Sequence, residues 1–81
     1  MDFSEALKQL KNGERVSRAG WNGKGMWLKR IEYYSVPQPI LPGYIFHLLP
    51  WIGMKTADNG FVPWLCSQTD MLADDWGVLD D

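Results

Sequence analysis

The chain has 81 residues, a formal charge of −2 at neutral pH and a sequence pI near 5.2. That length fits one domain, residues 1–81, near the lower limit for a single hydrophobic core. The acidic balance argues against binding long nucleic acid, whose affinity comes mostly from clustered Lys and Arg, but it leaves room for a small anion in a local pocket. Five Trp provide more aromatic surface than so short a chain can easily bury in its own core. We therefore expect part of that aromatic surface to be buried by a ligand or by a partner subunit in a homo-oligomer.

Few residues that form covalent or metal sites are present. Cys66 is the single cysteine and His47 the single histidine, so one chain forms no disulfide and no Cys/His metal set. We expect no cofactor and no metal. The N-terminal residues lack the basic and apolar regions of a signal peptide, and no apolar run approaches the roughly 20 residues that span a bilayer. The expected location is the cytoplasm, with no membrane partner.

Residues 2–13 have the pattern of a capped amphipathic helix. Asp2 and Glu5 have the spacing of a capping box, apolar residues then recur at helical spacing, and Asn12-Gly13 is suited to end the helix. The apolar stripe of this helix is expected to cover one face of the remaining chain.

The rest of the chain predicts short strands. Strand-like segments cover residues 14–18, 26–32, 44–49, 51–57, 61–64 and 74–79. Three prolines predict an exposed loop over residues 33–43, and Pro63 predicts an edge or bulged strand. Ser67 is a candidate N-cap for one helical turn reaching Ala73. The predicted fold class is α+β, with an N-terminal helix packed on a mostly antiparallel sheet and a short second helical turn near the C-terminus.

The stretch over residues 18–26 has the composition of a binding turn. Asn22-Gly23 is a strong signal for a tight two-residue hairpin turn, and Trp21 stands directly before it, between Arg18 and Lys24. A flat ring, a side-chain amide, backbone N–H groups and two cations suit a small planar anion such as a nucleotide. The alternative is that Trp21 packs on the core beside an ordinary turn.

A second polar group lies further along the chain. Thr56 and Asp58 are two residues apart, so their side chains point the same way in extended backbone. Asp58-Asn59-Gly60 also favours a turn unaided, which is the alternative for Asp58. The helix start at Ser67 offers N–H groups to an anion, and the side chains of Gln68, Thr69 and Asp70 could contact ribose hydroxyls and a base edge.

The sequence contains few candidate catalytic residues. Cys66 and His47 are the only thiol–base pair, and an inert buried Cys66 is the simpler interpretation. Asp70, Asp74 and Asp75 are carboxylates close in sequence, for which capping or solvation is the simpler role. The chain lacks both glycine-rich phosphate-binding motifs, the Walker type and the dinucleotide fingerprint. Nothing in the sequence requires an enzyme.

Several segments resemble a known family. These are Met-Asp-Phe-Ser-Glu-Ala-Leu-Lys-Gln-Leu-Lys-Asn-Gly at residues 1–13, Arg-Val-Ser-Arg-Ala-Gly-Trp-Asn-Gly-Lys-Gly-Met at 15–26, Met-Lys-Thr-Ala-Asp at 54–58 and the run at 62–76. They are similar to small phage and prophage proteins, long catalogued as a domain of unknown function and now known as the second Thoeris anti-defence family. The resemblance covers nearly the whole chain except residues 33–46.

The resemblance implies a function. Thoeris is a bacterial immune system in which a TIR-domain enzyme makes a cyclic ADP-ribose isomer as an alarm signal. Members of the family are homotetramers that sequester the signal without cleaving it, and some relatives capture cyclic di- or oligonucleotides. Carried onto this chain, the resemblance implies that Trp21 stacks on the base and that Asn22 and Gly23 approach phosphate or ribose. It also implies that Thr56, Asp58 and Asp70 hold polar groups in a pocket between subunits.

Three hypotheses follow from the sequence. The first is a non-enzymatic sponge for a cyclic nucleotide-derived signal in the infected bacterial cell. The second is an enzyme that hydrolyses or modifies that nucleotide. The third is a protein–protein module whose exposed Trp residues form an interface and which binds no nucleotide.

Overall fold

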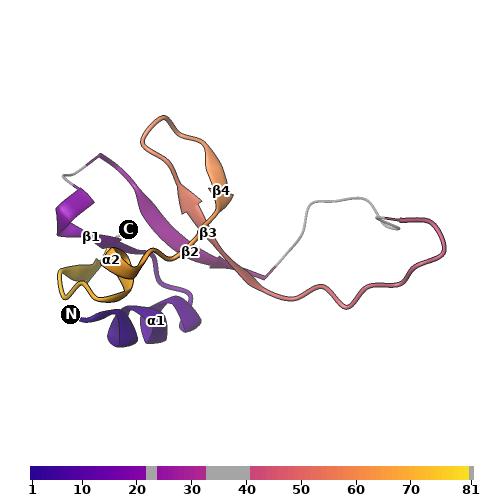
Figure 1. The fold of residues 1–81 in the computed structure, drawn as a ribbon, viewed down its shortest axis with the longest axis horizontal. Coiled ribbons are helices and arrows are strands. Elements are labelled where there is room, and N and C mark those ends of the chain that lie inside the picture. Colours follow the sequence, from indigo (N-terminus) through magenta and orange to yellow (C-terminus); the bar gives the residue numbers. More distant parts are fainter. Residues whose placement is uncertain (22–23, 33–40, 81) are drawn as a thin grey trace.

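The computed structural model describes residues 1–21, 24–32 and 41–80. Within them, two helices and one 3-10 turn accompany a five-stranded sheet (Figure 1). In chain order the elements are α1 (Phe3–Lys11), β1 (Val16–Arg18), η1 (Ala19–Trp21), β2 (Trp27–Ile31), β3 (Trp51–Lys55), β4 (Phe61–Pro63), α2 (Gln68–Met71) and β5 (Trp76–Val78). The predicted α+β class is confirmed. No helix among the described residues has the length and apolarity needed to cross a bilayer.

Both ends of α1 follow from local sequence. The Asp2 carboxylate accepts a hydrogen bond of 2.9 Å from the Glu5 backbone N–H, which satisfies one of the donors left free at a helix start. Asn12 is the C-cap, and Gly13 adopts a φ of +87°, a conformation that side chains with a Cβ rarely adopt. The predicted helix and both predicted caps are therefore confirmed.

The sheet is antiparallel throughout, in the order β4-β3-β2-β1-β5. The central pair, β2 and β3, runs in register from Trp27 opposite Lys55 to Ile31 opposite Trp51. β4 is an edge strand, as Pro63 predicts, because proline lacks the N–H that a second neighbouring strand would need. β5 forms the other edge by pairing with β1, so the last strand lies beside the first.

The core lies between α1 and one face of the sheet. Its buried side chains come from α1, β1, β2 and β5: Ala6, Leu10, Val16, Leu28 and Trp76. The Phe3 ring packs against Trp64 and Trp76 at centroid distances of 5.9 and 5.5 Å. The Met1 ammonium also donates to the Trp76 carbonyl at 2.8 Å, so the first and last elements are joined directly. Residues at the two ends of the chain therefore close one core.

The opposite face of the sheet carries a second aromatic cluster. Side chains alternate along strands, so the residues next to the buried Leu28 and the partly buried Met54 point away from α1. The Phe61 ring centroid lies 6.1 Å from that of Trp27 and 5.9 Å from that of Trp51. We call this surface the open sheet face, and it comprises Trp27, Lys29, Ile31, Trp51, Gly53, Lys55, Phe61 and Pro63. Of the described helices, α1 packs on the other face, where α2 joins it through Trp76.

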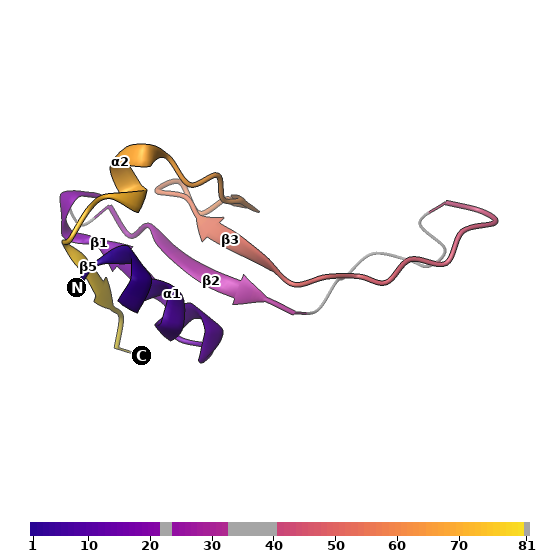
Figure 2. The ribbon, with the colours of Figure 1, turned by 60° about the horizontal axis from the view of Figure 1, so that its bottom comes forward.

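Residues 41–50 leave the sheet at Trp51, and we call this segment the arm: it is extended over residues 44–50 and ends in a turn at residues 41–43 (Figures 1 and 2). The predicted strand over residues 44–49 is wrong, because the structure assigns no strand there. The arm leads away from the sheet, so no described neighbouring strand accepts its ladder hydrogen bonds. The predicted loop over 33–43 lies mostly outside the described residues, and the part at 41–43 is a turn.

The connection between β1 and β2 is longer than the predicted two-residue turn. β1 ends at Arg18 and β2 begins at Trp27, and the first part of the connection is the 3-10 turn η1. Asn22 and Gly23 lie outside the described residues. The predicted position of Trp21 on a two-residue hairpin is therefore wrong, because η1 carries this side chain.

Candidate functional site

Arg18 is the centre of a charged cluster at one end of β1. Its guanidinium Nη1 lies 2.7 Å from Asp70 Oδ1, and its Nε lies 2.8 Å from Asp75 Oδ1. The side chains of Arg18 and Asp70 are only 16% and 15% exposed, so this double ion pair is largely shielded from water. The guanidinium therefore joins α2 to the segment that precedes β5.

Asp75 extends the cluster to the turn that carries Trp21. Its Oδ2 accepts a hydrogen bond of 2.7 Å from the Gly20 backbone N–H, and its carbonyl accepts one of 3.1 Å from Ala19 N–H. The hydrogen bonds from Arg18 and Gly20 hold the pKa of the Asp75 carboxyl below its ordinary value, and the two carboxylates raise the pKa of Arg18. The Asp75 carboxylate thus ties η1 to Arg18 of β1, and Arg18 in turn reaches α2 through Asp70.

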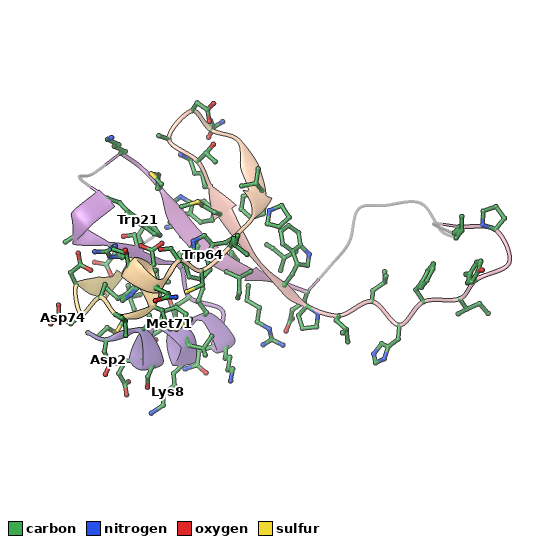
Figure 3. All side chains as sticks on the ribbon, in the orientation of Figure 1. Asp2, Lys8, Trp21, Trp64, Met71 and Asp74 are labelled. Carbon is green, nitrogen blue, oxygen red and sulfur yellow. The ribbon has the colours of Figure 1, made fainter. Side chains whose placement is uncertain are left out.

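Trp21 is half-buried and rests on the core (Figure 3). Its ring meets the Trp76 ring edge-on, with centroids 5.3 Å apart and an angle of 79° between planes. The Trp76 indole N–H in turn donates to the Asp70 carbonyl at 3.0 Å. Trp21 therefore packs on the core, which is the alternative that the sequence left open for it. The ring also remains partly exposed, as a base-stacking surface requires.

Thr56 and Asp58 form a separate polar group in the turn between β3 and β4. The Thr56 hydroxyl donates to Asp58 Oδ1 and accepts a hydrogen bond of 2.8 Å from the Gly60 N–H. The hydrogen bond from the Thr56 hydroxyl, with a contribution from the Gly60 backbone N–H, holds the pKa of the Asp58 carboxyl below its ordinary value. Asn59 has a φ of +69°, as expected in a tight turn. The turn itself is confirmed, and a ligand contact by either side chain stays a prediction.

Ser67, Gln68 and Thr69 are exposed at the start of α2. The Ser67 hydroxyl accepts a hydrogen bond of 3.1 Å from Asp70 N–H, so Ser67 is the N-cap that the sequence predicts. The helix has four residues and ends before Leu72, one turn that stops short of Ala73. The ligand contacts predicted for these three residues stay predictions.

The predicted site residues fall into two groups within one chain. Asp70 and Trp21 belong to the group around Arg18 and Trp76, whereas Thr56 and Asp58 lie beyond the far end of β3. No hydrogen bond or ring contact among the described residues links the two groups. A depression of about 460 Å³ lies beside the C-terminus of α1, and its lining (Lys11, Asn12, Gly13, Lys29, Arg30, Ile31 and Glu32) includes no predicted site residue.

The other candidate groups remain apart. Cys66 follows β4, where burial and the charge of Asp70 raise the pKa of its thiol, whereas His47 lies on the arm. A raised pKa disfavours the nucleophilic thiolate. Within the described ranges, no group of three or more His, Cys, Asp or Glu side chains could hold a metal ion.

Two residues that support the site were not identified from the sequence. The sequence favours a solvated or capping role for Asp75 and places Trp76 only in a final strand. Both roles depend on the pairing of β5 with β1, which sets Arg18 opposite Trp76. An arginine directly before a glycine-rich turn, with aspartates on a later helix, is the one local signal that could have suggested the cluster.

The fold and this geometry define a small α+β domain. It has a partly exposed Trp21 that packs on Trp76, and two separate clusters that contain carboxylates, one around Arg18 and one around Thr56. The family model for the Thoeris anti-defense 2-like domain matches residues 1–79. "Thoeris anti-defense 2" of Bacillus phage SP01 is 38% identical to this chain over 91 residues, covering 98% of this chain and 94% of the phage protein. The chain belongs to the Thoeris anti-defense 2-like family. Membership in this family supports a phage anti-defence role.

Proposed function

We propose that the chain is a sponge that binds a cyclic ADP-ribose-type immune signal and withholds it from the Thoeris effector without cleaving it. The observation that carries this proposal is family membership over nearly the whole chain. Cyclic di- and oligonucleotides belong to the same ligand class and are further candidates. The protein would act in the cytoplasm of the infected bacterial cell, as a homo-oligomer in which four copies assemble.

The arrangement around Trp21 supports a base-stacking role. The Trp21 ring packs edge-on against Trp76, and the Asp75 carboxylate accepts a hydrogen bond from the turn η1, which carries Trp21. A side chain already ordered in the free protein loses little conformational entropy when a base docks on it. Stacking of a base on an aromatic side chain contributes about 1–3 kcal/mol. Asn22 and Gly23, next in the chain, would approach the phosphates or ribose.

Thr56 and Asp58 would bind the ligand hydroxyls. A carboxylate has about four lone-pair positions, so the hydrogen bond from Thr56 leaves Asp58 able to accept others. Asp70 uses one oxygen for Arg18 and is the third member of this polar set. The separation of these groups within one chain agrees with a pocket built from two copies, with Ser67, Gln68 and Thr69 near its rim.

The affinity required is high but physically accessible. A sponge must outcompete the receptor, so its dissociation constant should be nanomolar or lower, equivalent to about −12 kcal/mol. A cyclic ADP-ribose has about 35 heavy atoms, and about 0.3 kcal/mol per atom yields about 10 kcal/mol. Cyclisation pre-organises the ligand and supplies part of the difference.

A capture-and-release experiment tests the proposal. The protein is incubated with a cyclic ADP-ribose isomer, filtered to remove free ligand, and then denatured. A sponge retains the signal on the filter and returns it intact after denaturation. A modified or hydrolysed product would instead support the enzyme hypothesis, and no retained nucleotide of any cyclic class would support the protein–protein module.

A further inference from the structure

A ligand that carries phosphates needs a cation, and Arg18 is already committed within the protein. Its guanidinium lies 2.7 Å from the Asp70 carboxylate and 2.8 Å from the Asp75 carboxylate, so one positive charge faces two negative charges. A phosphate brought to this guanidinium would also meet both carboxylates, which would repel it. The cation that the sequence offers to an anionic ligand is therefore neutralised by the fold, and the phosphates need another one.

Lys55 is a cation that the structure places beside both predicted ligand groups. It is the last residue of β3 and lies opposite Trp27, the first residue of β2. The β1–β2 connection and the β3–β4 turn both leave the sheet at this end (Figure 1). Trp21 belongs to that connection, and Thr56 and Asp58 belong to that turn.

Backbone carbonyls of these two segments hold the Lys55 ammonium in place. Its Nζ donates to the Gly25 carbonyl at 3.0 Å and to the Thr56 carbonyl at 3.3 Å. Gly25 has a φ of +71°, and a Cβ added there would lie 3.5 Å from Nζ, so the connection passes close to the ammonium. An ammonium carries one more N–H than these two contacts use. Within the described residues no further acceptor takes that N–H, which leaves it for a ligand.

The charge of Lys55 is not cancelled by an ion pair, since none of those among the described residues includes it. Asp58 is close enough to respond to that charge. The pKa of its carboxyl is lowered mainly by the hydrogen bond from Thr56, and the positive charge of Lys55 adds a small contribution. An ammonium and a carboxylate that are neighbours but not paired suit a nucleotide, whose phosphates and ribose hydroxyls are adjacent.

We propose that Lys55 binds a phosphate of the nucleotide ligand and is a further ligand-binding residue of the site. This assignment rests on the proposed function, because it needs a ligand that carries phosphates. The two carbonyls already fix the ammonium in the free protein, so a charge-assisted hydrogen bond to a phosphate oxygen requires little reordering of the side chain. Because Lys55 adjoins Thr56 in the chain, the assignment is the same for a pocket within one copy or between two.

Calorimetric titration with a cyclic ADP-ribose isomer, at low and at high salt, tests the assignment. Lys29→Met is the matched control, because Lys29 lies on the same sheet face and its Nζ donates to the Gly13 carbonyl at 2.9 Å, near the C-terminus of α1. At low salt, Lys55→Met should weaken binding by about tenfold to a hundredfold. Lys55→Arg, which keeps the charge, should retain most of the affinity, and Lys29→Met should bind as the wild type does.

The salt dependence separates a phosphate contact from a structural role. Salt screens the attraction between charges, so the wild-type affinity should fall as salt rises, and the affinity of Lys55→Met should fall less steeply. Lys29→Met removes the same charge away from the site and should keep the wild-type slope. Lys55→Gln, which keeps N–H donors for the two carbonyls without the charge, should show the same shallow slope, so the test does not depend on the stability of one variant.

Two results overturn the assignment. One is a Lys55→Met variant with wild-type affinity. The other is a pair of variants, Lys55→Met and Lys55→Gln, that bind less tightly but keep the wild-type salt slope, because the lysine then only holds the two segments together. The wild type decides the proposed function separately: a protein that captures the signal while Lys55→Met is unaffected overturns the assignment alone, whereas a protein that captures no cyclic nucleotide removes both.

Discussion

The two faces of the sheet carry similar aromatic clusters in different surroundings. On one face, Trp76 is 3% exposed, packs against α1 and supports Trp21. On the other, Phe61 contacts both Trp27 and Trp51, and all three lie outside the buried core. The same kind of residue therefore closes the core on one face and presents an apolar surface on the other. Burial by α1 accounts for the difference, since aromatic content is similar on both faces.

Replacing the central Trp on each face should have the largest effect and tests this difference directly. We expect Trp76→Ala to lower the free energy of unfolding by about 3–5 kcal/mol, because a large buried ring leaves a cavity. Trp27→Ala should lower the free energy of unfolding by less than Trp76→Ala does, because Trp27 lies outside the buried core. Denaturant unfolding of both variants at the same low protein concentration is the measurement. Equal losses for the two variants would contradict the distinction between the faces.

Trp21→Ala should separate binding from stability. The ring lies at the exposed margin of the covered cluster, so its loss should weaken nucleotide affinity by about tenfold to a hundredfold. The melting temperature should fall far less than in Trp76→Ala. Calorimetric titration and a thermal melt on the same sample measure both, with Leu65→Ala as an exposed control. A collapsed melt with unchanged affinity in the folded fraction would assign Trp21 to the core alone.

Asp70→Ala should weaken ligand binding by about 1–3 kcal/mol, because a ligand hydroxyl or amide would be left buried without its partner. The substitution also leaves Arg18 with Asp75 as its remaining carboxylate partner within the cluster. Asp70→Asn, which keeps an acceptor oxygen but removes the charge, should weaken binding less. If Asp70→Ala tightens binding, the carboxylate repels the phosphates and has no positive contact with the ligand.

The pH dependence of stability should reflect Asp75 and is the smallest expected effect. Because the folded-state pKa of Asp75 is lowered, the carboxylate stabilises the fold above its unfolded pKa of about 3.9. That contribution is lost as the pH falls through the lower folded-state pKa. Thermal melts between pH 6 and pH 2 should show a decline that Asp75→Asn flattens and the neighbouring Asp74→Asn does not. Parallel curves for the wild type and Asp75→Asn would contradict this assignment.

Local signals predicted most of the secondary structure. The caps of α1, the edge position of Pro63 and the Ser67 N-cap all follow from chemistry within a few residues, and all are confirmed. Residues 44–49 favour extended backbone and therefore predict a strand, but a strand also needs a neighbouring strand to pair with. The Arg18 cluster could not be predicted from local sequence, because its ion pairs join residues that are separated by 52 and 57 positions in the chain.

The pairing of β5 with β1 also governs when this protein can fold during synthesis. The core needs Trp76 against Ala6 and Val16, so a nascent chain that lacks its last strand cannot bury its first helix. Contacts between distant parts of a chain form late and slowly. Folding should therefore wait until the ribosome has released the C-terminal strand, and products truncated before Trp76 should be unfolded and readily degraded in the cell.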